Sequence, residues 1–97
     1  MRVLFSPEAR LEYEDAYAYY EAQQQGLGQR LKQDTRQALL RIRQWPLSCA
    51  VEKEGIRRLL LTRFPYKLLY SVEADHLYVI AFAHQHRAPE YWIDRVE

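Results

Sequence analysis

A Gly-Leu-Gly interruption at residues 26–28 separates two stretches whose apolar side chains recur with the period of an α-helix. The first stretch begins at Ser6 and Pro7, where serine is a favourable N-cap and proline fits the first helical position, and we expect it to run to about Gln25. The second stretch ends before Pro46, because proline cannot continue a helix. Two helices joined by so short a connection favour an antiparallel helical hairpin.

The segments on either side of this hairpin have the composition of β-strands. Residues 2–5 are predicted to form a short strand, and a loop is expected over residues 46–55. Three segments rich in β-branched, aromatic and leucine residues follow: Ile56 to Thr62, Tyr66 to Val72 and Leu77 to His84. A short turn or helix is expected from Ala88-Pro89. The order β-αα-βββ predicts one α+β domain over residues 1–97, in which the hairpin packs on a small, mainly antiparallel sheet.

The composition is that of an ordinary globular domain. The chain has 97 residues, of which 48% are hydrophobic and 28% charged. No stretch approaches the roughly 18 apolar residues of a membrane helix, and the residues before Glu8 are too few for a signal peptide, so we expect a cytoplasmic protein with no membrane partner. A single cysteine, Cys49, and three histidines offer no usual zinc spacing. We expect no metal, no cofactor and no small-molecule substrate.

The charges are segregated along the hairpin although the net charge is only +1. Residues 6–25 carry five acidic residues and one basic residue, whereas residues 26–45 carry five basic residues and one acidic residue. This pattern predicts an acidic helix beside a basic one. A basic segment is compatible with an acidic partner, but the excess is too small to identify that partner.

A cationic, titratable cluster is predicted at one end of the sheet. Its members lie on two neighbouring strands and at the end of the last strand: Arg57, Arg58, Arg63, Lys67, His84, His86 and Arg87. Arginine and lysine can hold a phosphate while histidine transfers protons, so phosphodiester recognition or cleavage is one interpretation. The alternative is that the basic residues are solvated strand charges.

The histidines and aromatic residues also have two interpretations. Strict alternation would place His84 and His86 on one strand face with Tyr78, Ile80 and Phe82, where a histidine is commonly a residue at the edge of the core. Tyr91 and Trp92 follow Pro89, and they either close the edge of the sheet or form an exposed aromatic site beside His86 and Arg87.

Several segments in order resemble the RelE/ParE superfamily, the toxins of bacterial type II toxin–antitoxin (plasmid stabilisation) systems. The segments that carry the resemblance are Phe5-Ser6-Pro7-Glu8-Ala9, Ala18-Tyr19-Tyr20-Glu21, Gly26-Leu27-Gly28, Ile56-Arg57-Arg58, Arg63 to Tyr70, and His84 to Trp92. This resemblance covers nearly the whole chain and is strongest to ParE-like members. It implies the same β-αα-βββ architecture and a cognate antitoxin that wraps the toxin.

The resemblance implies two rival targets. ParE-like members block DNA gyrase, whereas RelE-like members are ribosome-dependent mRNA endonucleases that need no metal. By position, Arg58 and Lys67 match basic catalytic residues of RelE, whereas Leu60 replaces a lysine. The last-strand arginine falls near His86 or Arg87, with His84 or His86 as the acid or base. Because the set is incomplete, gyrase inhibition is favoured over the nuclease, and an inactive member that only binds antitoxin is a further alternative.

The resemblance also implies a groove for the antitoxin along the hairpin and sheet. Its basic rim would be formed by Arg30, Arg36, Arg41 and Arg43, facing an acidic antitoxin segment. A solvated helix face is the alternative for these residues. Further contacts to target or partner are expected from Arg57, Arg63, Tyr91 and Trp92.

Overall fold

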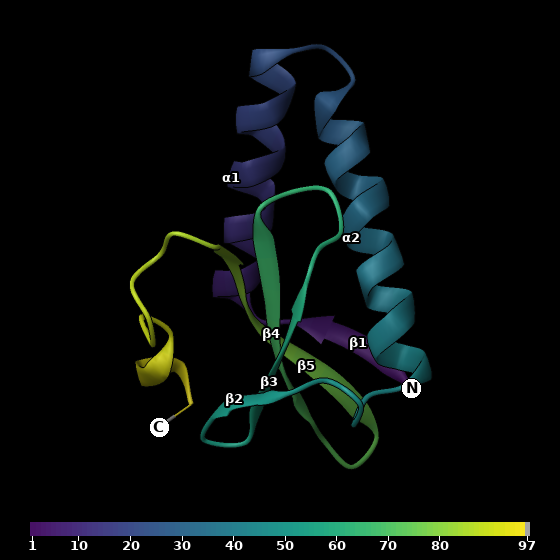
Figure 1. The fold of residues 1–97 in the computed structure, drawn as a ribbon, viewed down its shortest axis with the longest axis vertical. Helices are drawn as coiled ribbons and strands as arrows, with labels where there is room; N and C mark the ends of the chain where they lie inside the picture. Colours follow the sequence, from purple (N-terminus) through teal and green to yellow (C-terminus); the bar gives the residue numbers. More distant parts are fainter. Residues whose placement is uncertain (97) are drawn as a thin grey trace.

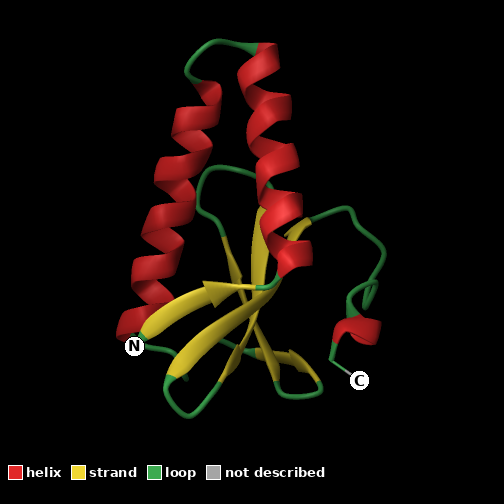
Figure 2. Ribbon diagram, turned by 180° about the vertical axis from the view of Figure 1, so that it is seen from behind, coloured by secondary structure: helices red, strands yellow, loops and turns green. Residues whose placement is uncertain are grey.

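The computed structural model describes residues 1–96, in which a helical hairpin packs against one face of a five-stranded sheet (Figure 1, Figure 2). The elements in chain order are β1 (Arg2–Phe5), α1 (Pro7–Gln23), α2 (Leu27–Gln44), β2 (Val51–Lys53), β3 (Ile56–Leu60), β4 (Tyr66–Val72), β5 (His76–His84) and a 3-10 turn, η1 (Ile93–Arg95). The sheet order is β1-β5-β4-β3-β2, with β1 parallel to β5 and all other neighbours antiparallel. The predicted α+β class and element order are confirmed, with β2 as an additional short strand.

The hairpin begins where the sequence indicated. The Ser6 side chain accepts a hydrogen bond from the Ala9 N–H at 3.0 Å, and Pro7 occupies the first helical position. The Ser6 N–H donates to the Val79 carbonyl at 2.9 Å, so the start of α1 is fixed directly to β5. Within residues 1–96, no helix is both long and apolar enough to cross a bilayer.

The turn between the helices begins earlier than predicted. α1 ends at Gln23, two residues before the expected end, because the Glu21 carboxylate accepts the N–H groups of Gly26 and Gly28, both at 2.9 Å. Gly26 adopts φ +90°, a left-handed conformation that favours glycine. A Cβ on Gly28 would lie 3.0 Å from the Tyr17 ring, so this glycine allows the helices to approach closely.

The chain between α2 and β4 differs from the expected loop and strand. Residues 51–53 form β2, which pairs with β3 through a turn in which Glu54 (φ 54°) and Gly55 (φ 75°) are both left-handed. Two such residues suit a tight hairpin turn, so the predicted loop over 46–55 is wrong at its end. β3 also ends at Leu60 rather than Thr62, because the chain turns there: the Asp34 carboxylate accepts the N–H groups of Arg63 and Phe64 at 2.8 and 2.9 Å.

An irregularity in β5 changes which side chains share a face. Tyr70 pairs with Val79 and Leu69 with Ala81, so Ile80 is an extra residue in the ladder. As a result Phe82 packs on the hairpin side, whereas Ile80 packs on the opposite face. The predicted common face for Ile80 and Phe82 is therefore wrong.

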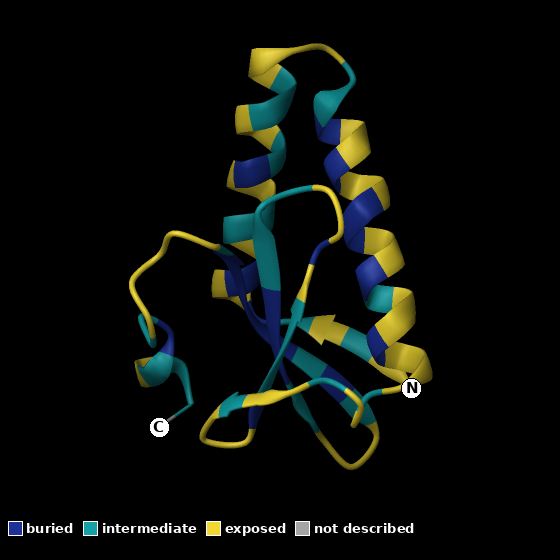
Figure 3. Ribbon diagram, in the orientation of Figure 1, coloured by how far each residue is buried: buried dark blue, intermediate teal, exposed yellow. Residues whose placement is uncertain are grey.

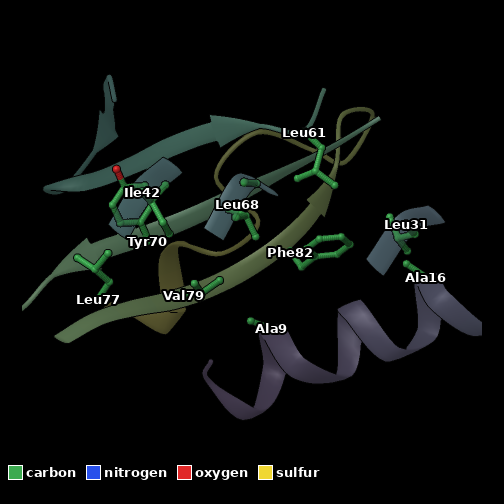
Figure 4. Packing of buried hydrophobic residues seen from close by; sticks show 11 residues of the cluster. Ala9, Ala16, Leu31, Ile42, Leu61, Leu68, Tyr70, Leu77, Val79 and Phe82 are labelled. Carbon is green, nitrogen blue, oxygen red and sulfur yellow. The ribbon is translucent and has the colours of Figure 1, made fainter. Parts of the chain in front are cut away.

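The sheet separates two apolar clusters. The larger cluster fills the space between hairpin and sheet; Figure 4 shows its members from α1, α2 and the strands, including Ala9, Ala16, Leu31, Ile42, Leu68, Tyr70, Val79 and Phe82. The smaller cluster lies on the face opposite the hairpin, called the open face below, and consists of Ile56, Leu69, Ile80, Ala81, Ala83 and Trp92. Figure 3 shows the buried stripe of α2 facing the sheet and exposed residues on its outer side.

Candidate functional site

Arg58 and Lys67 lie together on the open face. Lys67 lies between Tyr66 and Leu68 in the sequence, and both of these pack on the hairpin side. The Lys67 side chain therefore projects from the opposite face of the sheet. Lys67 Nζ lies 2.9 Å from Glu52 Oε1, and Arg58 Nη1 lies 3.8 Å from the same oxygen. The two cations are thus brought together as predicted, but a half-buried carboxylate from β2 lies between them.

Arg57 and Arg63 have other environments. Arg57 Nη1 donates to the carbonyl oxygens of Leu47 at 3.1 Å and Cys49 at 2.6 Å, so this side chain holds the loop after α2. Arg63 is exposed, and its backbone N–H donates to Asp34. These four basic residues of the predicted cluster therefore divide between the open face, a loop and an exposed turn.

His84 lies on the hairpin side of the sheet. Its ring meets the Tyr66 ring edge-on at 5.1 Å, and it lines a small pocket of about 230 Å³ with Asp15 and Tyr19 of α1. Its Nδ1 accepts the His86 N–H at 3.0 Å, so the neutral ring carries its proton on Nε2. The Nδ1 atom of His84 is therefore already used as a hydrogen-bond acceptor and is not free to act as a general base.

His86 and Arg87 lie in the exposed turn after β5. The Arg87 guanidinium stands 4.1 Å above the centre of the Tyr91 ring, a cation–π contact. Because His84 and the pair of Arg58 and Lys67 occupy opposite faces of the sheet, the structure does not assemble these three predicted nuclease residues around one point.

Tyr91 and Trp92 close the open face. Trp92 is only 1% exposed and packs in the smaller cluster, and Tyr91 packs partly against it. The Tyr91 hydroxyl donates to Glu12 Oε2 at 2.8 Å, and burial, together with this contact, raises the pKa of Tyr91. Of the two interpretations of this pair, the structure shows the closing of the sheet. Trp92 Nε1 is buried without a hydrogen-bond partner among the described residues.

A groove of about 700 Å³ runs between β1 and the two helices. Its lining is mainly apolar and aromatic, and four charged side chains complete it. The lining residues are Val3, Leu4, Phe5, Arg10, Tyr13, Glu14, Lys32, Thr35, Arg36, Leu39 and Tyr78. Such an open, largely apolar groove fits an amphipathic protein segment better than a small polar ligand.

Only one of the four predicted rim arginines lines this groove. Arg36 does so, whereas Arg43 Nε donates to the Met1 carbonyl at 3.1 Å and Arg41 Nη1 reaches Thr62 Oγ1 at 3.4 Å. Arg30 is exposed outside the lining. Lys32 and Arg10, which sequence reasoning did not select, are the other cations of the groove.

Comparison with known proteins identifies the family. Residues 3–89 match the family model described as ParE toxin of type II toxin–antitoxin system, parDE. The chain belongs to the ParE toxin family. No curated protein sequence matches the chain.

A similar fold is also found among solved structures. A chain described as the chromosomal ParDE TA system from P. aeruginosa matches with a TM-score of 0.75 and 18% sequence identity. The match covers 87% of this ParE-family chain and 95% of the solved one. At this identity the comparison supports the fold.

Among residues 1–96 of this ParE-family chain, Glu12 is the polar group with the most side-chain hydrogen bonds, and the sequence did not single it out. Its carboxylate accepts hydrogen bonds from Arg95, from the Tyr91 hydroxyl and from the Phe82 N–H at 3.1 Å. Phe82 lies beyond Val79, the last β5 residue paired with β1, so Glu12 takes the place of a neighbouring strand there. Burial raises the pKa of Glu12, but the hydrogen bonds from Arg95, Tyr91 and Phe82 outweigh burial and lower it overall.

Proposed function

We propose that this ParE-family chain is the toxin of a toxin–antitoxin pair, that it acts in the cytoplasm by inhibiting DNA gyrase, and that a cognate antitoxin neutralises it. Family membership supports the toxin assignment. The observation that favours gyrase over mRNA cleavage is the separation of His84 from Arg58 and Lys67 by the sheet. A ribonuclease needs its base and its phosphate-binding cations at one phosphodiester, whereas an inhibitor that acts by binding does not.

The groove beside β1 supports neutralisation by an amphipathic, acidic antitoxin segment. Its apolar lining includes Val3, Phe5 and Leu39. Arg10 Nε lies 3.5 Å from Glu14 Oε2, so these two side chains form an ion pair. Lys32 and Arg36 have no carboxylate partner within residues 1–96, so carboxylates of a bound segment would complement them while its apolar face enters the groove.

The target assignment is tested with purified components. The chain is added to gyrase and relaxed plasmid with ATP, and supercoiling is expected to stop. Normal supercoiling at saturating toxin would overturn the gyrase assignment. Cleaved mRNA in a translating extract given the same protein would establish the ribonuclease instead.

The groove is tested by reversing its charge. Lys32→Glu with Arg36→Glu is expected to abolish protection by the antitoxin while gyrase inhibition stays unchanged. Arg30→Glu makes the same kind of change on α2 outside the groove and serves as the matched control. If the double variant still binds antitoxin with unchanged affinity and unchanged salt dependence, the antitoxin does not use these cations.

A further inference from the structure

The loop between α2 and β2 displays large apolar side chains to solvent. Trp45, which directly follows α2, is 57% exposed, and Leu47 is 66% exposed. Val51 at the start of β2 is 51% exposed. Tryptophan is among the residues most enriched at the centres of protein interfaces, and an exposed one beside a second large apolar side chain needs an explanation.

The backbone of this loop is held firmly. The Ser48 Oγ donates to the Trp45 carbonyl at 2.9 Å, and the Tyr70 hydroxyl donates to the Pro46 carbonyl at 2.7 Å. Arg57 donates to the carbonyls of residues 47 and 49. The carbonyls of residues 45, 46, 47 and 49 are thus held by hydrogen bonds from the loop itself, from β3 and from β4. A loop ordered before binding loses little conformational entropy when it binds, which favours affinity.

Unpaired positive charge lies around the same loop. Arg43 stands in the last turn of α2 and Arg57 lies under the loop, whereas the Arg41 side chain of the same helical turn reaches Thr62 between β3 and β4. None of the three has a carboxylate within salt-bridge distance among residues 1–96, whereas the nearby Glu52 is already occupied by Lys67. The surface therefore combines apolar anchors with a basic surround.

We propose that this loop is the surface through which the chain binds its protein target, with Trp45 and Leu47 entering an apolar pocket bordered by carboxylates. Taking gyrase as that target rests on the proposed function. None of the residues that line the groove beside β1 belongs to the loop, so target and antitoxin contacts are separable by mutation.

The test compares wild type with the double variant Trp45→Ser, Leu47→Ser. Leu11→Ser is the matched control, because Leu11 is a leucine 58% exposed on α1, outside the loop. Circular dichroism reports whether each variant keeps its fold, and antitoxin binding by a folded variant reports whether the loop also contacts the antitoxin. Growth arrest after induction reports loss of target binding whatever the target, and gyrase binding and supercoiling report the identity of the target.

The double variant is expected to lose growth arrest and to bind gyrase at least about tenfold more weakly, while antitoxin binding and the Leu11→Ser control stay normal. Growth arrest unchanged in a folded double variant would overturn the loop inference and leave the gyrase proposal intact. Arrest lost in the double variant while wild type fails to bind gyrase would support the loop and overturn gyrase. A wild-type dimer that the double variant dissolves would show a second copy on this surface and overturn the inference, as would loss of antitoxin binding.

Discussion

Glu12 and Arg95 are 83 residues apart in the chain, and two hydrogen bonds join them, Nη1 to Oε1 at 2.9 Å and Nη2 to Oε2 at 3.1 Å. Arg95 Nη1 also donates to the Ile80 carbonyl at 2.9 Å. One ion pair therefore connects α1, β5 and the segment that covers the open face. Bidentate arginine–carboxylate pairs of this kind are among the stronger polar contacts in proteins.

Replacing Glu12 with alanine is expected to loosen the C-terminal segment. The substitution leaves Arg95 and the Phe82 N–H without their partner, which costs about 2–3 kcal/mol of unfolding free energy. Chemical denaturation measures the loss, and amide exchange at residues 91–96 locates it. A change below about 0.5 kcal/mol, the usual range for surface substitutions, would show that Trp92 packing alone holds the segment.

The same carboxylate gives the stability a dependence on pH. Because the pKa of Glu12 is lower in the folded chain than its ordinary value of 4.5, its stabilisation is complete above that value and is lost as the pH falls through the lower folded pKa. The unfolding free energies of wild type and Glu12→Gln are therefore expected to converge as the pH is lowered from 7 to 3. A difference that stays constant over this range would contradict the ionic contribution.

Asp34 fixes the turn between β3 and β4. Asp34→Ala leaves the N–H groups of Arg63 and Phe64 without their acceptor, and we expect a cost of about 2–3 kcal/mol with faster amide exchange at both residues. Asp34→Asn retains an acceptor oxygen and should cost less. Equal losses for the two variants would indicate that charge, rather than hydrogen bonding, is what Asp34 supplies.

The two glycines of the helical hairpin should differ in how they tolerate alanine. Gly26→Ala meets no atom within 4 Å and costs only its left-handed conformation, about 1 kcal/mol. Gly28→Ala places a methyl group 2.9 Å from Glu21 Oε1 and 3.0 Å from the Tyr17 ring, so steric crowding should cost about 1–3 kcal/mol. Adding Tyr17→Ala should reduce the loss of thermal stability caused by Gly28→Ala but not the loss caused by Gly26→Ala, and thermal denaturation of the single and double variants measures both. Rescue of both, or of neither, would refute this distinction.

Removing the two open-face cations tests the ribonuclease alternative. Arg58→Ala with Lys67→Ala, and separately His84→Ala with His86→Ala, are expected to leave growth arrest unchanged. Glu52→Gln is the control for losing the ion pair without losing the cations. Abolished toxicity in variants that keep their fold and their antitoxin binding would favour mRNA cleavage.

The parts of the fold that were predictable carry their signals locally. The N-cap at Ser6, the break at residues 26–28 and the stop at Pro46 each act within a few residues, so the hairpin followed from the sequence. β2 was missed because it has three residues and depends on pairing with β3. The extra residue at Ile80 was missed because period-two alternation contains no signal for a bulge.

The candidate surfaces were less predictable than the fold. Arg58 and Lys67 were placed correctly beside each other, because antiparallel strands in sequence are neighbours in space. Glu12, Asp34 and Arg95 were not selected, since their partners are 15 to 83 residues away and no spacing rule links them. The sequence pattern places Trp45 at the end of the second predicted helix and Leu47 in the predicted loop, and only the exposure of their side chains distinguishes them.

The parallel pairing of β1 with β5 has a consequence for synthesis. Arg2–Phe5 pairs with His76 to Val79, so β1 cannot join the sheet until β5 has been synthesised. A ribosome releases the chain from its N-terminus onward, and α1 and α2 can associate early, whereas the sheet cannot be completed until β5 has emerged. Chains interrupted at any codon before β5 therefore lack the frame on which the groove and the covered open face depend.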